Sequence, residues 1–239
     1  MTKRITLILI FASTLITGFV SCIKKDPISR ITQVLMVPLS PDALAVDFKI
    51  NNTLFATTVG YSSTTGTVTY TLPYYTIAPG TTNVYYNLTG TPNAYASKEG
   101  ETLEDNAYST FLIDSVKRAK LAWVVDDLEE PTPGKVKIRF FHFSANAPAV
   151  DVVAVASGAK WFANRTFNDQ EGKPELQSFI EVDPGVYTFA FRLANTSTAA
   201  YTTSNITLLP DRIYTLAARG VVGGAGSKAL GAWLYPNRP

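Results

Sequence analysis

The chain contains one short motif twice, about a hundred residues apart, and this repetition limits the possible fold more than any other feature. The first copy, at residues 37–50, reads VPLSPDALAVDFKI, and the second, at residues 140–154, reads FFHFSANAPAVDVVA. Each copy holds a serine, then turn-forming residues, then Ala-Val-Asp at the start of a run of strand-forming residues. We therefore expect one folding unit to occur twice.

Other landmarks recur in the same order, with offsets that grow slowly from 104 to 110 residues. The matching landmarks are Asp47 with Asp151, Pro79-Gly80 with Pro184-Gly185, Asp105 and Tyr108 with Asp211 and Tyr214, and Ala122-Trp123 with Ala232-Trp233. Such a series is typical of a duplication.

Strand-forming residues dominate the chain after residue 22. Thr, Val, Tyr and Phe stand in short runs broken by Pro, Gly, Asn and Asp, which is typical of an all-β fold. Val46, Phe48 and Ile50 alternate with polar residues, which predicts a strand with one buried face. Residues 150–155 are apolar at almost every position, so we expect a strand covered on both faces, with the first module as one candidate cover.

Two kinds of turn recur between the predicted strands. Residues 78–81 (APGT) and 183–186 (DPGV) suit type II turns, because proline fixes φ and glycine accepts a positive φ. Leu-x-Asp-x-x-Tyr at 103–108 and at 209–214 resembles the tyrosine corner of immunoglobulin-like sandwiches, in which a Tyr hydroxyl bonds nearby backbone. We expect the turns to join strands at 74–77 and 84–88 and at 179–182 and 187–193.

The N-terminal segment has the pattern of a secretion signal that ends at the only cysteine. Two basic residues precede an apolar run that is too short to span a membrane, which predicts a signal peptide over residues 1–21. Phe19-Val20-Ser21-Cys22 resembles the lipobox of bacterial lipoproteins, although its first two residues depart from the usual pattern.

Cys22 cannot form a disulfide within the chain, because it is the only cysteine. An incidental cysteine beside a cleavage site is one interpretation. The resemblance to lipoproteins implies another, which we favour: Cys22 carries acyl chains such as palmitate, and residues 22–29 are a lipidated tether. Ile23 stands where an Asp would resemble an inner-membrane retention signal, so we expect an outer-membrane lipoprotein, with its side of the membrane left open.

The fold class and domain boundaries follow from these landmarks. We expect an all-β chain with two tandem immunoglobulin-like, Greek-key antiparallel β-sandwich domains, at residues 30–125 and 135–236, after a cleaved lipoprotein signal peptide. Residues 126–134 (DDLEEPTPG) separate them, and we interpret this acidic segment as a solvated, semi-stiff linker. A calcium site is the alternative, since Ca²⁺ needs several converging carboxylates, but the spacing of known calcium loops is missing.

The second copy of the motif also carries a resemblance to a known family. Residues 137–152 (KIRFFHFSANAPAVDV), with Pro184-Gly185 and Val186-Tyr187 downstream, resemble the signature of the bacterial domain-of-unknown-function family 4397. The resemblance is strong in the second copy and weaker in the first, where Pro38 stands at the position of His142. Tandem copies of this family's domain imply an extracytoplasmic β-sandwich and no assigned activity.

The candidate catalytic residues lack partners in the sequence. His142 is the only histidine, whereas a catalytic triad or a zinc site needs several convergent groups, so we interpret it as a strand residue whose ring bonds the adjacent turn. Asp47 and Asp151 lie in separate modules, too far apart to act as paired glycosidase carboxylates, and we interpret both as acceptors that fix turns. The sequence therefore predicts no enzyme, no metal site and no cofactor.

Three further features bear on binding. The mature chain is near neutral, because Lys3 and Arg4 account for the formal charge of +2, and it has no run of basic residues, which excludes nucleic-acid binding. Residues 220–226 (GVVGGAG) lack the Lys-Ser/Thr of a phosphate loop and are expected to form a mobile hairpin loop. Asp114-Ser115-Val116 resembles a bacterial O-glycosylation acceptor, and whether Ser115 is glycosylated stays open.

Exposed aromatic side chains are the remaining candidates for a binding site. Strand alternation places one of Tyr85 and Tyr86 inward and the other outward. Trp161 follows a turn and is the best candidate for exposure, with Phe162 beside it. We expect Trp161, Phe162 and Tyr85 to offer flat faces to a ligand, with core packing as the alternative for any one of them.

These observations together predict a lipid-anchored cell-envelope protein, attached to the membrane through Cys22. We expect it to act as a non-enzymatic binding or adhesion module, whose partner is a glycan or an envelope protein. The alternative is a structural subunit of an outer-membrane protein assembly.

Overall fold

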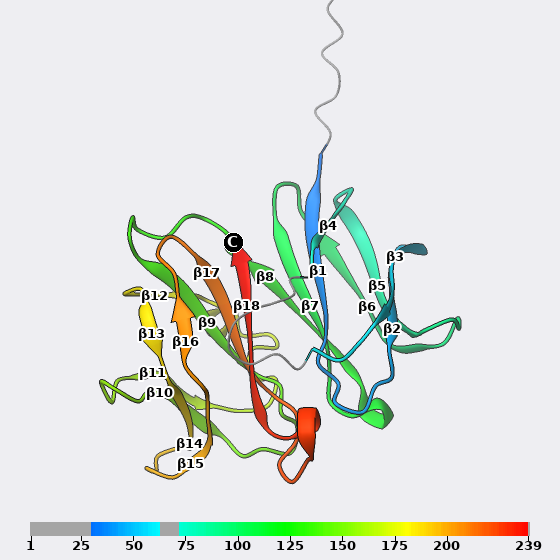
Figure 1. The fold of residues 1–239 in the computed structure, drawn as a ribbon. Helices are drawn as coiled ribbons and strands as arrows, with labels where there is room; N and C mark the ends of the chain where they lie inside the picture. The colour runs from blue at the N-terminus through cyan, green and yellow to red at the C-terminus, as the bar shows by residue number, and fades with distance from the viewer. Residues whose placement is uncertain (1–29, 63–71, 239) are drawn as a thin grey trace, which may run out of the picture.

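The computed structural model describes residues 30–62 and 72–238 (Figure 1). The predicted signal peptide, Cys22 and the tether lie outside the described residues. Within the described part, every regular element is a strand or a single turn of 3-10 helix, which confirms the all-β prediction. That part also holds no helix of the length and hydropathy needed to cross a bilayer.

The first half of the chain forms two four-stranded sheets, with strand orders β4-β1-β7-β8 and β3-β2-β5-β6. The strands are β1 (Thr32–Pro38), β2 (Val46–Ile50), β3 (Thr53–Val59), β4 (Tyr74–Ile77), β5 (Gly80–Leu88), β6 (Ala94–Thr102), β7 (Ala107–Ile113) and β8 (Lys120–Asp126), with the 3-10 turn η1 (Val116–Arg118) between β7 and β8.

The second half repeats this arrangement, with strand orders β12-β9-β17-β18 and β11-β10-β14-β15, and with a separate pair, β13 with β16, because the counterparts of β5 and β6 are each divided into two strands. Its strands are β9 (Val136–His142), β10 (Val150–Ala154), β11 (Lys160–Arg165), β12 (Ile180–Val182), β13 (Gly185–Tyr187), β14 (Phe189–Leu193), β15 (Ala199–Thr202), β16 (Ile206–Leu208), β17 (Ile213–Arg219) and β18 (Gly231–Arg238), with 3-10 turns η2 (Pro174–Leu176) and η3 (Gly226–Lys228).

One parallel strand pair occurs at the same place in each half, which the antiparallel prediction did not include. β1 pairs in parallel with β7, and β9 pairs in parallel with β17. Parallel neighbours need a long connection between them, and here the chain passes through the other sheet of the sandwich before it returns. The duplicated strand order therefore includes its least common feature.

The sheets that contain β1 and β9, which we call the inner sheets, pack against each other and share one hydrophobic core. Phe111 of the first half lies in this core together with Phe141, Phe143 and Trp233 of the second. The ring centroid of Phe111 is 5.8 Å from that of Phe141 and 4.9 Å from that of Phe143. The two remaining four-stranded sheets, the outer sheets, cover the stack on either side (Figure 1).

Alternation along β9 explains why it is buried on both faces. Ile138 and Phe140 point into the core of the second half, whereas Phe141 points into the core shared with the first half. The first half does not cover residues 150–155, contrary to that expectation, because these residues lie mostly in β10 of the outer sheet. The first half covers β9, β17 and β18 instead.

The predicted type II turns are corners between sheets, and they do not join hairpins. β4 ends at Ile77 and β5 begins at Gly80, but these strands lie in different sheets. Gly80 has a φ of 125°, a conformation that residues with a side chain rarely adopt, which explains the glycine. Pro184-Gly185 lies at the equivalent corner after β12. The Pro-Gly pairs mark these corners, but Gly80 and Gly185 are the first residues of β5 and β13, and the local pattern does not reveal that the flanking strands pair with different neighbours.

The match between the two tryptophans was wrong by one residue. Trp123 faces its own outer sheet, where its ring packs over Gly100, whereas Trp233 faces the other half and packs edge-on against Phe111. A shift of one residue turns a strand side chain to the opposite face. The residue of β18 that faces its own outer sheet as Trp123 does is Leu234, in the core of the second half.

The tyrosine corners are present in both halves, as predicted. The backbone N–H of Leu103 donates to the Tyr108 hydroxyl at 3.0 Å, and that of Leu209 donates to the Tyr214 hydroxyl at 3.2 Å. In each corner the intervening Asp has a positive φ, 59° in one and 60° in the other. The resemblance to immunoglobulin-like corners is therefore one of hydrogen bonding as well as sequence.

The acidic linker is shorter than predicted at its start. Asp126 belongs to β8 and is buried, because its carboxylate binds Arg139 at the interface between the halves. Asp127 bonds the Lys137 ammonium group at 2.9 Å. In the described part of the chain, no three potential metal-binding side chains converge.

Candidate binding cleft between the two halves

The two predicted aromatic residues of β11 pack against neighbouring rings. Trp161 and Phe162 are both half-buried on this edge strand of the second outer sheet. The Trp161 ring packs edge-on against Tyr187 and Phe189, with centroid distances of 4.9 and 5.0 Å. Trp161 is therefore less exposed than expected, because these two rings cover one of its faces.

Tyr85 lies on the other side of the molecule. It is half-buried on β5 of the first outer sheet, whereas Tyr86 is fully buried, which confirms the predicted alternation. The Tyr86 hydroxyl accepts from Val37 N at 2.8 Å and donates to the Thr110 carbonyl at 2.7 Å. Because Tyr85 and Trp161 lie in opposite outer layers (Figure 1), they cannot belong to one small-ligand site.

The two predicted turn-fixing carboxylates each bridge two backbone turns, in the same way in each half. Asp47 accepts from Thr58 N (3.0 Å) and Gly90 N (2.9 Å), and Asp151 accepts from Asn164 N (2.7 Å) and Asn195 N (3.2 Å). The prediction for both residues is confirmed.

These hydrogen bonds also lower the pKa of both carboxyls. At Asp47 the backbone N–H of Gly90 has the largest effect, and that of Thr58 adds to it. At Asp151 burial acts in the opposite direction, but the Lys160 ammonium group and the two backbone donors outweigh it and lower the pKa. Both groups are thus held ionised as hydrogen-bond acceptors.

His142 is buried and its ring bonds the adjacent turn, as predicted. Its Nε2 lies 3.1 Å from the Pro148 carbonyl oxygen. Burial lowers the pKa of the imidazole, and the bond to Pro148 offsets this only in part. His142 is therefore neutral at physiological pH and is part of the folded motif.

A buried ion pair joins the two halves. Arg139 on β9 donates to the Asp126 carboxylate on β8, and both side chains are inaccessible to solvent. The guanidinium group also donates to the Val125 carbonyl at 3.0 Å and to the Thr215 hydroxyl at 2.9 Å. A buried pair is tolerated when further hydrogen bonds satisfy both ions, and Arg139 meets that condition.

Equivalent polar contacts from each half meet in the same network. The Ser109 hydroxyl donates to Asp126 at 2.6 Å, and the Thr215 hydroxyl donates to Asn237 at 2.6 Å. Tyr74 links them, since its hydroxyl donates to Asp126 at 2.6 Å and accepts from Asn237 at 2.8 Å. Burial, with the Asp126 charge, raises the pKa of Tyr74 well above its usual value, so this hydroxyl remains a donor.

Each half also extends a segment onto the other. In the second half, Phe167 packs against the shared core and Glu171 lies 3.3 Å from the Lys98 ammonium group of β6. In the first half, the segment before β4 receives a hydrogen bond at the Leu72 carbonyl from the Tyr235 hydroxyl of β18. These reciprocal contacts hold the halves in one relative position.

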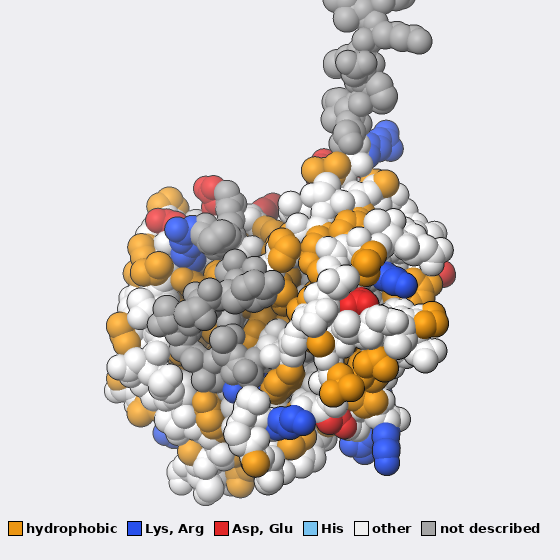
Figure 2. Space-filling view, turned by 45° about the vertical axis from the view of Figure 1, so that its right-hand side comes forward, with side chains coloured by type: hydrophobic (Ala, Val, Ile, Leu, Met, Phe, Trp, Pro, Cys, Tyr) orange, Lys and Arg blue, Asp and Glu red, His pale blue; other side chains and the backbone are white. Residues whose placement is uncertain are grey.

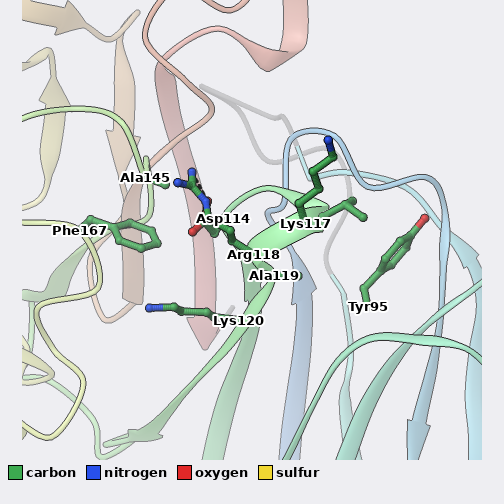
Figure 3. Close-up of a pocket in the computed structure, with 9 residues that line it drawn as sticks. Tyr95, Asp114, Lys117, Arg118, Ala119, Lys120, Ala145 and Phe167 are labelled. Atoms are coloured by element: carbon green, nitrogen blue, oxygen red, sulfur yellow. Dashed lines mark hydrogen bonds and ion pairs between the residues drawn. The ribbon is translucent and has the colours of Figure 1, made fainter.

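A cleft of about 660 Å³ opens where Ala145 and Phe167 of the second half lie near the end of the first inner sheet. The turn between β7 and β8, which includes η1, forms one side of it. Arg118 and Lys120 point from this turn toward Ala145 and Phe167 of the second half, and Tyr95 of β6 lies on the opposite side (Figure 3). The cleft exists only because the two halves are docked.

The cleft has a positive lining. Lys117, Arg118 and Lys120 are exposed, and Asp114 is the single acidic residue among the described residues that line it. Asp114 is paired with the Arg118 guanidinium at 3.2 Å and accepts from Ser115 N at 2.7 Å. Lys117 and Lys120 therefore provide charge that the lining itself does not compensate.

The sequence patterns do not single out this cleft. The available signal was KRAK at residues 117–120, three basic residues in four positions that lead into β8. The opposite wall, Phe167, comes from the other half, and no local pattern indicates that contact. Ser115, the candidate residue for glycosylation, is half-buried immediately before η1.

The glycine-rich segment at residues 220–226 lies near this end of the molecule and connects β17 to η3 and β18, as a hairpin loop was predicted to do. Asn146 fixes it with two hydrogen bonds: its side-chain amide donates to the Val222 carbonyl at 3.0 Å, and its side-chain oxygen accepts from Val222 N at 2.9 Å.

Two solved structures are similar to the chain at low identity. One is described as "Alpha-glucan binding by a streptococcal virulence factor" (13% identity, TM-score 0.23, covering 74% of this chain and 88% of that chain). Another is a leucine-rich repeat protein from Bacteroides thetaiotaomicron (12% identity, TM-score 0.18, covering 81% of this chain and 26% of that chain). With TM-scores this low, neither likeness carries an argument. No curated protein matches the chain.

A family model described as "Domain of unknown function (DUF4397)" matches residues 32–153. The matched range begins at β1, includes the described first half and ends within β10, so it contains both copies of the Ala-Val-Asp motif. It lies mainly on the first half, whereas the sequence signature was more evident in the second. Because the match spans more than half of the chain, the protein belongs to the DUF4397 family.

Proposed function

We propose that this protein is a lipid-anchored component of the cell envelope that binds a ligand without transforming it, and that the cleft between its halves is the binding site. The observation that carries the proposal is the cleft itself, with its positive and aromatic lining from both halves. Clefts at domain junctions, with a few convergent polar groups, are common ligand sites. The tightly bonded interface supports it by fixing the geometry of the walls.

The two halves are, in this proposal, tandem copies of the family's domain. Their equal strand orders, their paired tyrosine corners and their equivalent turn-bridging aspartates support a duplication. The anchor rests on the lipobox-like sequence that ends at Cys22, and the outer membrane on the absence of Asp at position 23.

The position of the cleft suits a protein tethered at its N-terminus. β1 leads away from the N-terminal end, and β7 runs parallel to it, so η1 and the cleft lie beyond the Pro38 end of β1. Seven strand residues span about 23 Å. In Figure 2, basic side chains are visible at the lower right, at the foot of the molecule. A chain anchored at Cys22 would present the cleft away from its own membrane.

The proposal of a non-enzymatic role rests on what the titratable side chains do. The carboxylate oxygens of Asp47 and Asp151 accept hydrogen bonds from backbone N–H groups. His142 is buried, and its ring bonds the Pro148 carbonyl. Catalytic groups need to reach a substrate, and these three are committed to the fold.

Two measurements test the proposal. Cell fractionation of the full chain should place it in the outer membrane after a salt wash, and Cys22→Ala should release it; retention of the variant would contradict the anchor. An array of glycans and envelope proteins, probed with the secreted Cys22→Ala chain, should show saturable binding. A silent array together with stoichiometric co-purification of envelope proteins would favour the alternative, a structural subunit of an outer-membrane assembly.

A further inference from the structure

Beyond the general binding role, on which this inference rests, the charge and shape of the cleft indicate a class of ligand. We propose that the cleft binds an anionic saccharide, that is, a sugar chain with carboxylate or sulfate groups. Four features carry this proposal: the uncompensated cations, the aromatic walls, the equivalent place in the second half and the direction in which the cleft faces.

The cations are arranged to receive separate anionic groups. Arg118 is held by Asp114 at 3.2 Å, and Val116 N at the start of η1 donates to Asp42 at 2.8 Å, so the turn is fixed at both ends. Lys117 lies in this fixed turn and Lys120 begins β8 directly after it. The Lys120 side chain points toward Phe167, and the Lys117 side chain points away from it (Figure 3). Charge-assisted hydrogen bonds from such groups favour carboxylate or sulfate over neutral hydroxyls.

The aromatic walls favour a sugar ring over a simple ion. Phe167 and Tyr95 are each half-buried, so each ring is supported by packing while part of it faces the cleft. An aromatic face stacks on the apolar C–H face of a pyranose, and the Tyr hydroxyl adds a hydrogen-bonding tip. The volume of about 660 Å³ is in the range of clefts that hold ligands the size of a short sugar chain or a drug molecule.

The equivalent place in the second half carries fewer cations, although the fold there is the same. The turn η3 has Ser227 at the position that Lys117 takes in η1, and Lys228 at the position of Arg118. Arg219, at the end of β17, lies 5.8 Å from the Tyr61 ring of the first half and donates to the Ala229 carbonyl at 3.2 Å. The Arg219 guanidinium is engaged in these contacts, so the open, cationic cleft is not a necessary product of the repeated scaffold.

The direction of the cleft disfavours a phosphate headgroup as its ligand. The cleft lies at the end of β7 that is remote from the start of β1, and a chain tethered at residues 22–29 holds that start toward the membrane. Lipid headgroups of the anchoring membrane are therefore on the wrong side, whereas a polysaccharide outside the protein can reach the cleft.

The test measures binding of the secreted Cys22→Ala chain by calorimetry at low salt and at 0.5 M salt. The probes are a polyuronate, a sulfated glycan, dextran as a neutral glycan, polyphosphate, and vesicles that contain phosphatidylglycerol. The double variant Lys117→Gln/Lys120→Gln removes two cleft charges. Lys173→Gln/Lys228→Gln removes two exposed charges outside the cleft and serves as the control.

We expect a polyuronate or sulfated glycan to bind more tightly than dextran, with salt weakening the binding. The cleft variant should lose roughly tenfold or more in affinity, because two charge-assisted contacts disappear, while the control changes less than about twofold. Equal losses of affinity in the cleft variant and the control would overturn the proposal of an anionic saccharide, and so would polyphosphate or vesicles that bind more tightly than either anionic glycan. Binding of dextran alone would overturn the anionic class but leave the binding role standing, whereas no binding of any probe or array ligand would remove both.

Discussion

The two halves of the molecule have the same strand order, the same tyrosine corner and the same turn-bridging aspartate, yet they differ where they meet. In the shared polar network, Asp126 of the first half and Asn237 of the second each accept a hydrogen bond from a hydroxyl group on the neighbouring strand. Of these two residues, only Asp126 is charged, and it pairs with Arg139. Two differences at equivalent places, Asp126 for Asn237 and Arg139 for Leu35, thus turn a repeated contact into an ion pair. The repeated strand order forms the scaffold of both halves, and the unequal residues at the junction hold the two halves together in one orientation.

A second difference lies at the ends of β7 and β17. The first-half turn has six residues between the strands, fixes Arg118 with Asp114, and leaves an open cleft against Phe167. The second-half connection is longer, and there Arg219 lies near Tyr61. The two halves therefore differ in chemistry at the junction, although their strand orders are the same.

The largest effect is expected from breaking the ion pair. Arg139→Ala would leave the Asp126 carboxylate buried without its counter-ion, which costs about 3–5 kcal/mol of unfolding free energy. Urea denaturation at pH 7 measures it. The matched control is Arg139→Met with Asp126→Asn, which makes the first half resemble the second and should recover most of the loss. A double variant as unstable as Arg139→Ala would contradict the charge argument.

The two tryptophans provide the next comparison. Trp233 is buried between the halves, stacked on Tyr235 with its centroid at 5.4 Å, so Trp233→Ala should cost about 3–4 kcal/mol. Trp123 is half-buried beside Tyr108, and Trp123→Ala should cost about half as much. Chemical denaturation followed by far-UV circular dichroism compares them without relying on tryptophan fluorescence. Equal losses would mean that the junction is packed no better than the edge of the first half.

The turn-bridging aspartates should behave alike in the two halves. Asp47→Ala and Asp151→Ala each remove an acceptor of two backbone N–H bonds, at a cost of about 2 kcal/mol. Asp151 also pairs with Lys160 at 2.6 Å, but that ammonium group is partly exposed, so the pair adds less than about 1 kcal/mol. Lys160→Ala, introduced into the wild type and into Asp151→Ala, measures the coupling energy of this pair. A coupling energy well above about 1 kcal/mol would contradict the expectation.

The same residues set a pH dependence. The pKa of each carboxyl is lower in the folded protein than in the unfolded chain, so the stability it contributes is complete above the unfolded pKa of about 4 and is lost as the pH falls through the folded pKa. Urea denaturation at pH 7 and pH 3 should show a smaller difference for Asp47→Asn and for Asp151→Asn than for the wild type. An unchanged difference would show that other groups control acid sensitivity.

Local patterns in the sequence predicted the repeated all-β unit, the tyrosine corners and the roles of Asp47 and Asp151, because each depends on contacts within one unit. Docking of the units depends on residues far apart. The clue was in β9, where Phe140 and Phe141 are both apolar and must face opposite cores, but residues 150–155 show the same pattern and made β10 an equally good candidate. The cleft could not be predicted, because its walls join only after docking.

The tryptophan match shows a different limit of sequence comparison. The connection before β18 is longer than that before β8. An alignment of Ala122-Trp123 with Ala232-Trp233 therefore matches identical residues but places the strand one residue out of register. Because side chains alternate with period two, that shift exchanges the own-core face for the interface face. Hydrogen-bonded residues such as Ser109 and Thr215, which bind Asp126 and Asn237, mark the true correspondence.

The smallest expected effect gives the sharpest test of whether the two halves unfold together. Tyr108→Phe and Tyr214→Phe remove the acceptors of the Leu103 and Leu209 backbone N–H groups, respectively, at a cost of about 1 kcal/mol each. The Tyr108 hydroxyl also accepts a long contact of 3.5 Å from the Asn106 side-chain amide, which adds little. The corners lie in separate halves, so the costs should add in the double variant. The shared core and the buried ion pair predict one unfolding transition, which both variants shift by similar amounts in calorimetry. Two transitions, each moved by only one of the variants, would show that the halves are independent domains and that the cleft opens before either half unfolds.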